Sequence, residues 1–147
     1  MPFVKLDHNI NNEKINNLLR NGTTFIGAFS KSCPHCINMH YEWKKFISMV
    51  NKYKINATIL EIDANILSSI KNPLINNNIE GFPSLFIIKN NKFVATYNQD
   101  RKATSFLQFL NKYVSKATKN HTKRMRLKQQ RTRKNKNKNK NINSIIA

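Results

Sequence analysis

The chain has only two cysteines, Cys33 and Cys36, and just Pro34 and His35 separate them. A Cys-x-x-Cys that opens a helix places its first sulfur at the helix N-terminus, where unpaired N–H groups and the positive end of the dipole favour a thiolate. A thiolate with a second thiol in reach can carry out thiol–disulfide exchange. Since no other cysteine exists, the pair cannot belong to a larger disulfide framework. We expect Cys33 to be the nucleophile and Cys36, one turn into the helix, to be the buried resolving thiol.

The competing interpretation of the cysteine pair is half of a zinc site, with His35, His40 or another histidine as a further ligand. Structural zinc takes four ligands, usually as two close pairs. The sequence has no second Cys-x-x-Cys and no His-x-x-x-His. The pattern therefore favours a redox couple, in which the Cys33–Cys36 disulfide is itself the redox group and no other cofactor or metal is expected.

Positive charge is concentrated at one end of the chain. The formal net charge is +19, and residues 115–147 hold 12 Lys and Arg with no acidic residue. Such a segment cannot bury enough apolar surface to offset its ordering entropy, so we predict a domain at 1–114 and a disordered basic tail at 115–147. Such a tail is suited to bind nucleic acid or another polyanion, to serve as a nuclear or nucleolar targeting signal, or to dock on an acidic surface such as the interior of a viral particle. Its plain alternative is a solubilising appendage.

The remaining composition gives expectations about compartment and source. Residues 1–19 contain isolated apolar residues and no apolar run, so we expect neither a secretory leader nor a membrane span. A protein of a reducing compartment, either cytoplasmic or packaged in a virion, fits a Cys-x-x-Cys that is not structural. The abundance of Asn, Lys and Ile suggests an AT-rich eukaryote or a large DNA virus as the source. We expect a monomer.

The apolar pattern of residues 1–114 alternates between strands and helices. Runs of β-branched and aromatic residues predict buried strands, and one-sided apolar residues predict amphipathic helices. Asn9 is the expected N-cap of the first helix. The helix after the cysteines is expected to bury Ile37, Trp43, Phe46, Ile47 and Val50. The predicted strands are 3–6, 23–30, 57–63, 84–89 and 92–97, and the predicted helices are 9–20, 34–52, 66–71 and 103–114.

Three stretches of the chain, in this order, resemble the thioredoxin superfamily, and more closely a single catalytic domain of protein disulfide isomerase. The first is the Cys-Pro-His-Cys motif, followed by the aromatic segment Glu42–Phe46. The second is Ile79–Leu85, which contains Gly-Phe-Pro-Ser at the place of a family cis proline. The third is Tyr97–Leu110, in which Arg101 falls on a family arginine.

The resemblance covers roughly residues 3–114 and implies a thioredoxin-like α/β fold, with a central mixed sheet flanked by helices. It implies that the Phe82–Pro83 bond is cis and lies beside the cysteines. The Phe82 backbone would then pair with an extended substrate segment, by strand addition. The Pro83 ring would obstruct a metal that approaches the sulfurs.

Two further side chains have expected roles, that of Arg101 by resemblance and that of His35 from its place between the sulfurs. Arg101 is expected to favour the Cys36 thiolate during resolution; its alternative is a solvated loop residue. His35, between the sulfurs, is expected to donate to the Cys33 thiolate or to pair with it when charged. Its alternative is an exposed loop histidine without a role.

Four positions depart from the family pattern. Ser32 stands in place of Trp, Tyr41 in place of a helix-kinking Pro, and Pro34 in place of Gly. The resulting Pro-His dipeptide resembles that of the strongly oxidising bacterial periplasmic disulfide oxidase. Gly27, six residues before Cys33, stands where the family usually has a buried Asp or Glu that relays protons for the second cysteine.

These observations predict a protein thiol–disulfide oxidoreductase that acts on protein thiols and disulfides. The competing class is a non-enzymatic protein that binds or packages nucleic acid or another polyanion on an old thioredoxin scaffold. The intact Cys-x-x-Cys and Gly-Phe-Pro favour the enzyme, and the basic tail favours an added binding role.

Overall fold

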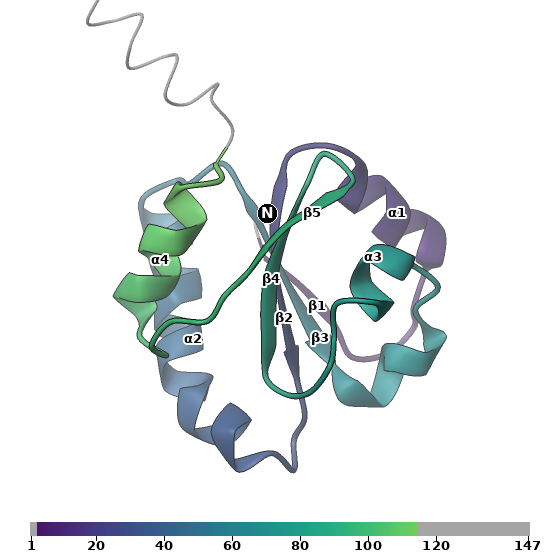
Figure 1. The fold of residues 1–147 in the computed structure, drawn as a ribbon, viewed down its shortest axis with the longest axis horizontal. Helices are drawn as coiled ribbons and strands as arrows, with labels where there is room; N and C mark the ends of the chain where they lie inside the picture. Colours follow the sequence, from purple (N-terminus) through teal and green to yellow (C-terminus); the bar gives the residue numbers. More distant parts are fainter. Residues whose placement is uncertain (1–2, 115–147) are drawn as a thin grey trace, which may run out of the picture. The chain divides into compact units, whose positions relative to one another are not determined.

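The computed structural model of the protein describes residues 3–114 and shows a five-stranded sheet between two helical layers (Figure 1). The strands are β1 (Phe3–Leu6), β2 (Thr23–Phe29), β3 (Thr58–Asp63), β4 (Ser84–Lys89) and β5 (Lys92–Thr96). The helices are α1 (Asn12–Arg20), α2 (Pro34–Lys52), α3 (Pro73–Asn76) and α4 (Ala103–Asn111), with a 3-10 helix, η1 (Ala64–Ser69). The mixed sheet flanked by helices that the resemblance implied is confirmed.

The strand order β1-β3-β2-β4-β5 places β2 at the centre of the sheet. β1 and β2 pair with β3 in parallel, whereas β4 pairs with β2 and β5 in antiparallel fashion. β2 is buried from Thr23 to Ala28, as expected for an uncharged, β-branched and aromatic run. Because β2 and β3 are parallel, their carboxyl ends meet at one edge of the sheet. That edge carries both the cysteine loop after β2 and Asp63 at the end of β3.

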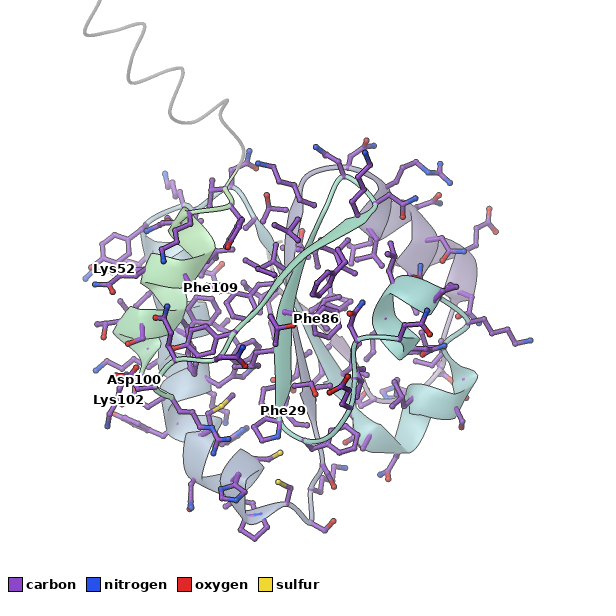
Figure 2. The ribbon with its side chains drawn as sticks, viewed as in Figure 1. Phe29, Lys52, Phe86, Asp100, Lys102 and Phe109 are labelled. Carbon is purple, nitrogen blue, oxygen red and sulfur yellow. The ribbon has the colours of Figure 1, made fainter. Side chains whose placement is uncertain are left out.

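Alternate residues of each central strand face two separate apolar layers. On β2, Phe25 packs beneath α2 and α4, and Ile26 packs beneath the layer of α1 and α3. Figure 2 shows Phe109 in the first layer and Phe86 beside the strands toward the second. The first layer is largely aromatic, with edge-on contacts that hold Trp43 against Phe25 and Phe106. This packing fixes α2, and therefore the cysteines, against the sheet.

The start of the first helix differs from the prediction. Asn9 has φ +50°, a left-handed conformation, and so cannot provide the extended backbone of an N-cap. Asn11 is extended instead, and its side chain accepts a hydrogen bond from the N–H of Lys14 at 3.1 Å. Three asparagines lie within four residues here, so composition alone could not choose the cap.

Two further predictions about helices were wrong. Ile37 is 60% exposed, because the buried stripe of α2 runs through Cys36, Met39 and Trp43 and leaves the neighbouring position facing solvent. The helix expected at 66–71 is the 3-10 helix η1, which begins earlier because the Asp63 side chain accepts from the N–H of Asn65 at 2.9 Å. A separate short helix, α3, follows it.

The predicted tail, 115–147, lies outside the described residues, so its disorder and the domain boundary at 114 stay predictions. Within residues 3–114, none of the helices has both the length and the apolar character needed to span a bilayer.

Candidate active site at the start of the second long helix

Cys33 is the N-cap of α2, and the first turn of that helix surrounds its sulfur. Its backbone is extended, and its carbonyl accepts from the N–H of Ile37 at 3.1 Å, which begins the helix. Pro34 occupies the first helical turn, where a missing N–H removes no intrahelical bond. The N–H groups of His35 and Cys36 both act as donors to the Cys33 sulfur. The local sequence thus produces the helix-start thiol that the Cys-x-x-Cys pattern predicted.

The two sulfurs differ in their exposure. Cys33 is half-buried, whereas Cys36 is only 5% exposed. The Cys36 sulfur accepts from the N–H of Ser30 at 3.5 Å, and the Cys33 N–H donates to the Ser30 carbonyl at 3.2 Å. The turn after β2 therefore holds both cysteines and leaves only the first partly exposed to solvent.

The same environment moves the two thiol pKa values in opposite directions. The backbone N–H of Cys36 and then its thiol donate to Cys33 and hold the pKa of Cys33 below its ordinary value, and the His35 N–H adds to this. Burial raises the pKa of Cys36 to about 11. Of the two thiols, Cys33 is accordingly the one that loses its proton at the lower pH, and Cys36 is the thiol that donates to it.

The loop before β4 lies beside Cys33. The Phe82–Pro83 peptide bond is cis, which confirms the expected isomer. The Cys33 thiol lies 3.4 Å from the Phe82 carbonyl oxygen and donates to it. The structure therefore brings Cys33, Cys36, Phe82 and Pro83 together, although they are separated by about half of the folded domain in sequence.

Arg101 is exposed and lies in the segment between β5 and α4. The main causes of the two pKa shifts are the hydrogen bonds to Cys33 and the burial of Cys36. The positive charge of Arg101 is a smaller cause, and it lowers the pKa of both thiols.

Glu42 of α2 accepts from the N–H of Ala103 at 2.8 Å and so caps α4, which has no cap from its own Lys102 side chain. Sequence reasoning missed this role of Glu42, because it joins residues 61 positions apart.

Pro34 and His35 are both exposed at the tip of the site. The contribution of His35 to the Cys33 thiolate comes from its backbone N–H, through the hydrogen bond described above. The role expected for its imidazole stays a prediction.

At Gly27, where the resemblance leads one to expect a carboxylate, the rings of Trp43 and Phe29 fill the space that a side chain would need. A Cβ atom placed there would lie 2.8 Å from two carbons of the Trp43 indole and 2.7 Å from the Phe29 ring. The indole is itself 1% exposed, and its N–H donates to Glu61 on β3 at 2.8 Å. The space over Gly27 is therefore filled by carbon, and no side chain fits there without moving the core.

The zinc interpretation gains no support from the fold. Among residues 3–114, no three or more His, Cys, Asp or Glu side chains gather in a way that could hold a metal ion. His40, one helical turn after Cys36, is exposed on α2.

Selective alkylation tests the pKa asymmetry of the thiols. At neutral pH, iodoacetamide should modify Cys33 at least about tenfold faster than Cys36, since each pKa unit changes the thiolate fraction tenfold. Peptide mass spectrometry of quenched samples measures both rates. In urea the two rates should converge, because the causes of the shifts are lost on unfolding. Equal rates in the folded protein would contradict the assignment of the two thiols.

A sequence model of a known family, described as Thioredoxin, matches residues 3–112. A thioredoxin domain-containing protein 5 homolog of Drosophila melanogaster is 22% identical over 102 residues, which are 69% of this chain and 24% of that protein. A protein disulfide-isomerase of Hordeum vulgare is 29% identical over 89 residues, 59% of this chain and 17% of that protein. The chain thus spans at most about a quarter of the length of these curated relatives.

Among solved structures, reduced thioredoxin pre-protein of Schistosoma mansoni has a similar fold. The TM-score is 0.57 and the identity is 17%, and the match covers 78% of this chain and 100% of the other. The likeness of the folds extends over the sheet and its helices, and at this identity it concerns the fold alone.

Proposed function

Because this chain belongs to the thioredoxin family, we propose that it is a protein thiol–disulfide oxidoreductase that works through a Cys33–Cys36 dithiol–disulfide couple. The observation that carries the proposal is the difference in exposure and in pKa between the two thiols. Cys33 is half-buried with a lowered pKa, and Cys36 is buried with a pKa raised to about 11. The Cys33 sulfur is therefore suited to attack a substrate disulfide, and the Cys36 sulfur to attack in the later resolving step.

In the reducing direction, the Cys33 thiolate attacks one sulfur of a substrate disulfide and forms a mixed disulfide, and the other substrate sulfur leaves as a thiolate. Cys36 then loses its proton and attacks Cys33, which releases the second substrate sulfur and leaves a Cys33–Cys36 disulfide. Oxidation of a substrate dithiol runs through the same steps in reverse.

Phe82 and Pro83 are proposed to receive the substrate chain. The Phe82 carbonyl oxygen lies 3.4 Å from the sulfur of Cys33, the more exposed of the two cysteines. A substrate segment that runs beside this loop in extended form would present its sulfur to Cys33, and its backbone would pair with Phe82. Arg101 is proposed to favour the Cys36 thiolate by its charge.

Turnover of a protein disulfide tests the proposed function. The full chain should accelerate insulin reduction by dithiothreitol, and alkylation of Cys33 before the assay should remove the acceleration. Lack of acceleration by the reduced, folded protein would leave the binding interpretation as the better account.

We propose a second function for residues 115–147, which is to bind nucleic acid or another polyanion. Its support is the sequence: 12 Lys and Arg and no acidic residue in this segment. Each phosphate that a cation neutralises releases condensed counterions, so log affinity for duplex DNA should fall with log salt at ~0.9 per contact. Without aromatic residues in the segment, base stacking should contribute nothing and sequence preference should be absent.

A variant with four substitutions tests the contribution of residues 115–147 to DNA binding. The substitutions are Arg124→Gln, Arg126→Gln, Arg131→Gln and Arg133→Gln. The salt slope on duplex DNA should fall by up to ~4 units relative to the wild-type chain, since each contact contributes about 0.9. Insulin reduction should be unchanged, because none of these residues belongs to the thiol site. An identical slope in the two proteins would reduce the tail to a solubilising appendage.

A further inference from the structure

Behind Cys36 is a cavity of about 290 Å³. Cys36 and Ile37 line it from α2, and Glu61 and Asp63 line it from β3. This volume is ample for ordered water, and water needs polar partners such as these carboxylates. A buried thiol and a carboxylate therefore line one space that is large enough to hold water.

Glu61 is fixed in place by two contacts. Its Oε1 accepts from the indole N–H of Trp43 at 2.8 Å, and its Oε2 lies 3.7 Å from the Lys5 ammonium on β1. Its side chain is 14% exposed. Glu61 is also the register partner of Gly27 on the parallel strand β2, so the two positions face the same side of the sheet, toward α2.

The indole of Trp43 thus has two effects at once. Its six-membered ring closes the space above Gly27, and its N–H holds the carboxylate on the neighbouring strand. An acid at position 27 is excluded by geometry, whereas an acid at position 61 faces the cavity that reaches Cys36.

The other titratable groups around this cavity have different surroundings. Lys5 pairs with Glu61, and Lys31 lies 3.7 Å from Asp63. Asp63 also caps η1 through the N–H of Asn65, so one of its oxygens is already occupied. His40 lines the cavity from an exposed position on α2.

We propose that Glu61 is the proton acceptor for Cys36, acting through water in this cavity. The inference rests on the proposed oxidoreductase function. In the resolving step, the proton of the Cys36 thiol passes to the Glu61 carboxylate. The Cys36 thiolate then attacks Cys33, the Cys33–Cys36 bond forms, and the bond from Cys33 to the substrate sulfur breaks. The substrate leaves as the reduced thiolate, and Glu61 returns the proton to solvent.

Glutathione disulfide is a suitable probe, because its reaction with the reduced protein separates the two steps. Acid quenching and mass spectrometry measure the mixed disulfide at Cys33 and its decay. In Glu61→Gln, the mixed disulfide should form at the wild-type rate but decay at least about tenfold more slowly at neutral pH, since general-base catalysis contributes ~10²–10⁴-fold. Its decay should accelerate with hydroxide until the pH approaches the Cys36 pKa of about 11, where the two proteins converge.

Three comparisons separate this role from a structural one. The glutamine can still accept from the Trp43 indole, so tryptophan fluorescence and the melting temperature should stay close to wild type. Glu61→Asp keeps a carboxylate and should keep the wild-type form of the pH profile, which tests the proposal even if Glu61→Gln folds poorly. Asp63→Asn removes the other carboxylate of the cavity and should leave the decay rate unchanged.

Two results would overturn the proposal while leaving the oxidoreductase function intact. One is wild-type decay with an unchanged pH profile in Glu61→Gln, and the other is slow decay in Asp63→Asn instead. If the wild-type protein forms no mixed disulfide with glutathione disulfide, the proposed function itself fails, and the role of Glu61 fails with it.

Discussion

Cys33→Ser should lower the rate of insulin reduction to the uncatalysed rate while leaving the fold intact. The substitution removes one sulfur from a half-buried helix start and replaces it with a hydroxyl that stays protonated near neutral pH. The Cys36 thiol cannot take over, because it is 5% exposed and its burial raises its pKa to about 11. The loss should therefore be nearly complete, and it should not be recovered by higher substrate concentration.

Ser32→Ala is the matched control for this loss. Ser32 is exposed and adjacent to Cys33, and its hydroxyl lies 3.1 Å from that of Ser30 without an interaction with either sulfur. The variant should keep most of the turnover. Measurable turnover in Cys33→Ser, or its loss in Ser32→Ala, would mean that the attacking group has been assigned wrongly.

Gly27→Asp should be strongly destabilising, although an acid is the residue that the family resemblance leads one to expect there. The Cβ alone would approach the rings of Trp43 and Phe29 to within 2.8 Å and 2.7 Å. Overpacking of this kind costs about 1–3 kcal/mol. A carboxylate placed in an aromatic layer without a hydrogen-bond partner adds a desolvation cost of similar size or more.

Urea unfolding of Gly27→Ala, Trp43→Leu, their double variant and Gly81→Ala isolates the steric part of this effect. Gly27→Ala should lower the free energy of unfolding by about 1–3 kcal/mol, and clearly less in a Trp43→Leu background, where the indole is absent. Gly81→Ala should be nearly neutral, since a Cβ there would have no neighbour within 4 Å. An equal cost of Gly27→Ala with and without Trp43 would show that the indole does not close this position.

The sequence predicted the parts of this structure that depend on local pattern. The uncharged run of β2 and the apolar face of α4 indicated buried elements, and the Cys-Pro-His-Cys spacing placed the two sulfurs on the first turn of α2. The expected cis bond before Pro83 came from resemblance, because its local sequence contains no physical signal strong enough to specify the isomer.

The parts that sequence reasoning missed depend on which neighbour fills a space. Glycine at position 27 shows only that a carboxylate is missing; that Trp43 occupies the space requires the distance between α2 and β2. Glu61 did carry a signal that could have been used, since this charged residue stands between the apolar Leu60 and Ile62 of β3. Ile37 was expected in the core as one of the apolar residues of its helix, whereas the stripe through Cys36 and Met39 leaves it exposed.

The measurement that tests the central claim most directly is trapping with Cys36→Ser. This variant keeps the Cys33 thiol and the loop of Phe82 and Pro83 but cannot resolve the first product. On reaction with insulin under non-reducing conditions, it should accumulate a mixed disulfide through Cys33, identified by peptide mass spectrometry, while the wild-type protein accumulates far less. The proposed roles, in which Cys33 attacks and Cys36 resolves, would be contradicted if the folded Cys36→Ser protein retains a reactive Cys33 but forms no mixed disulfide.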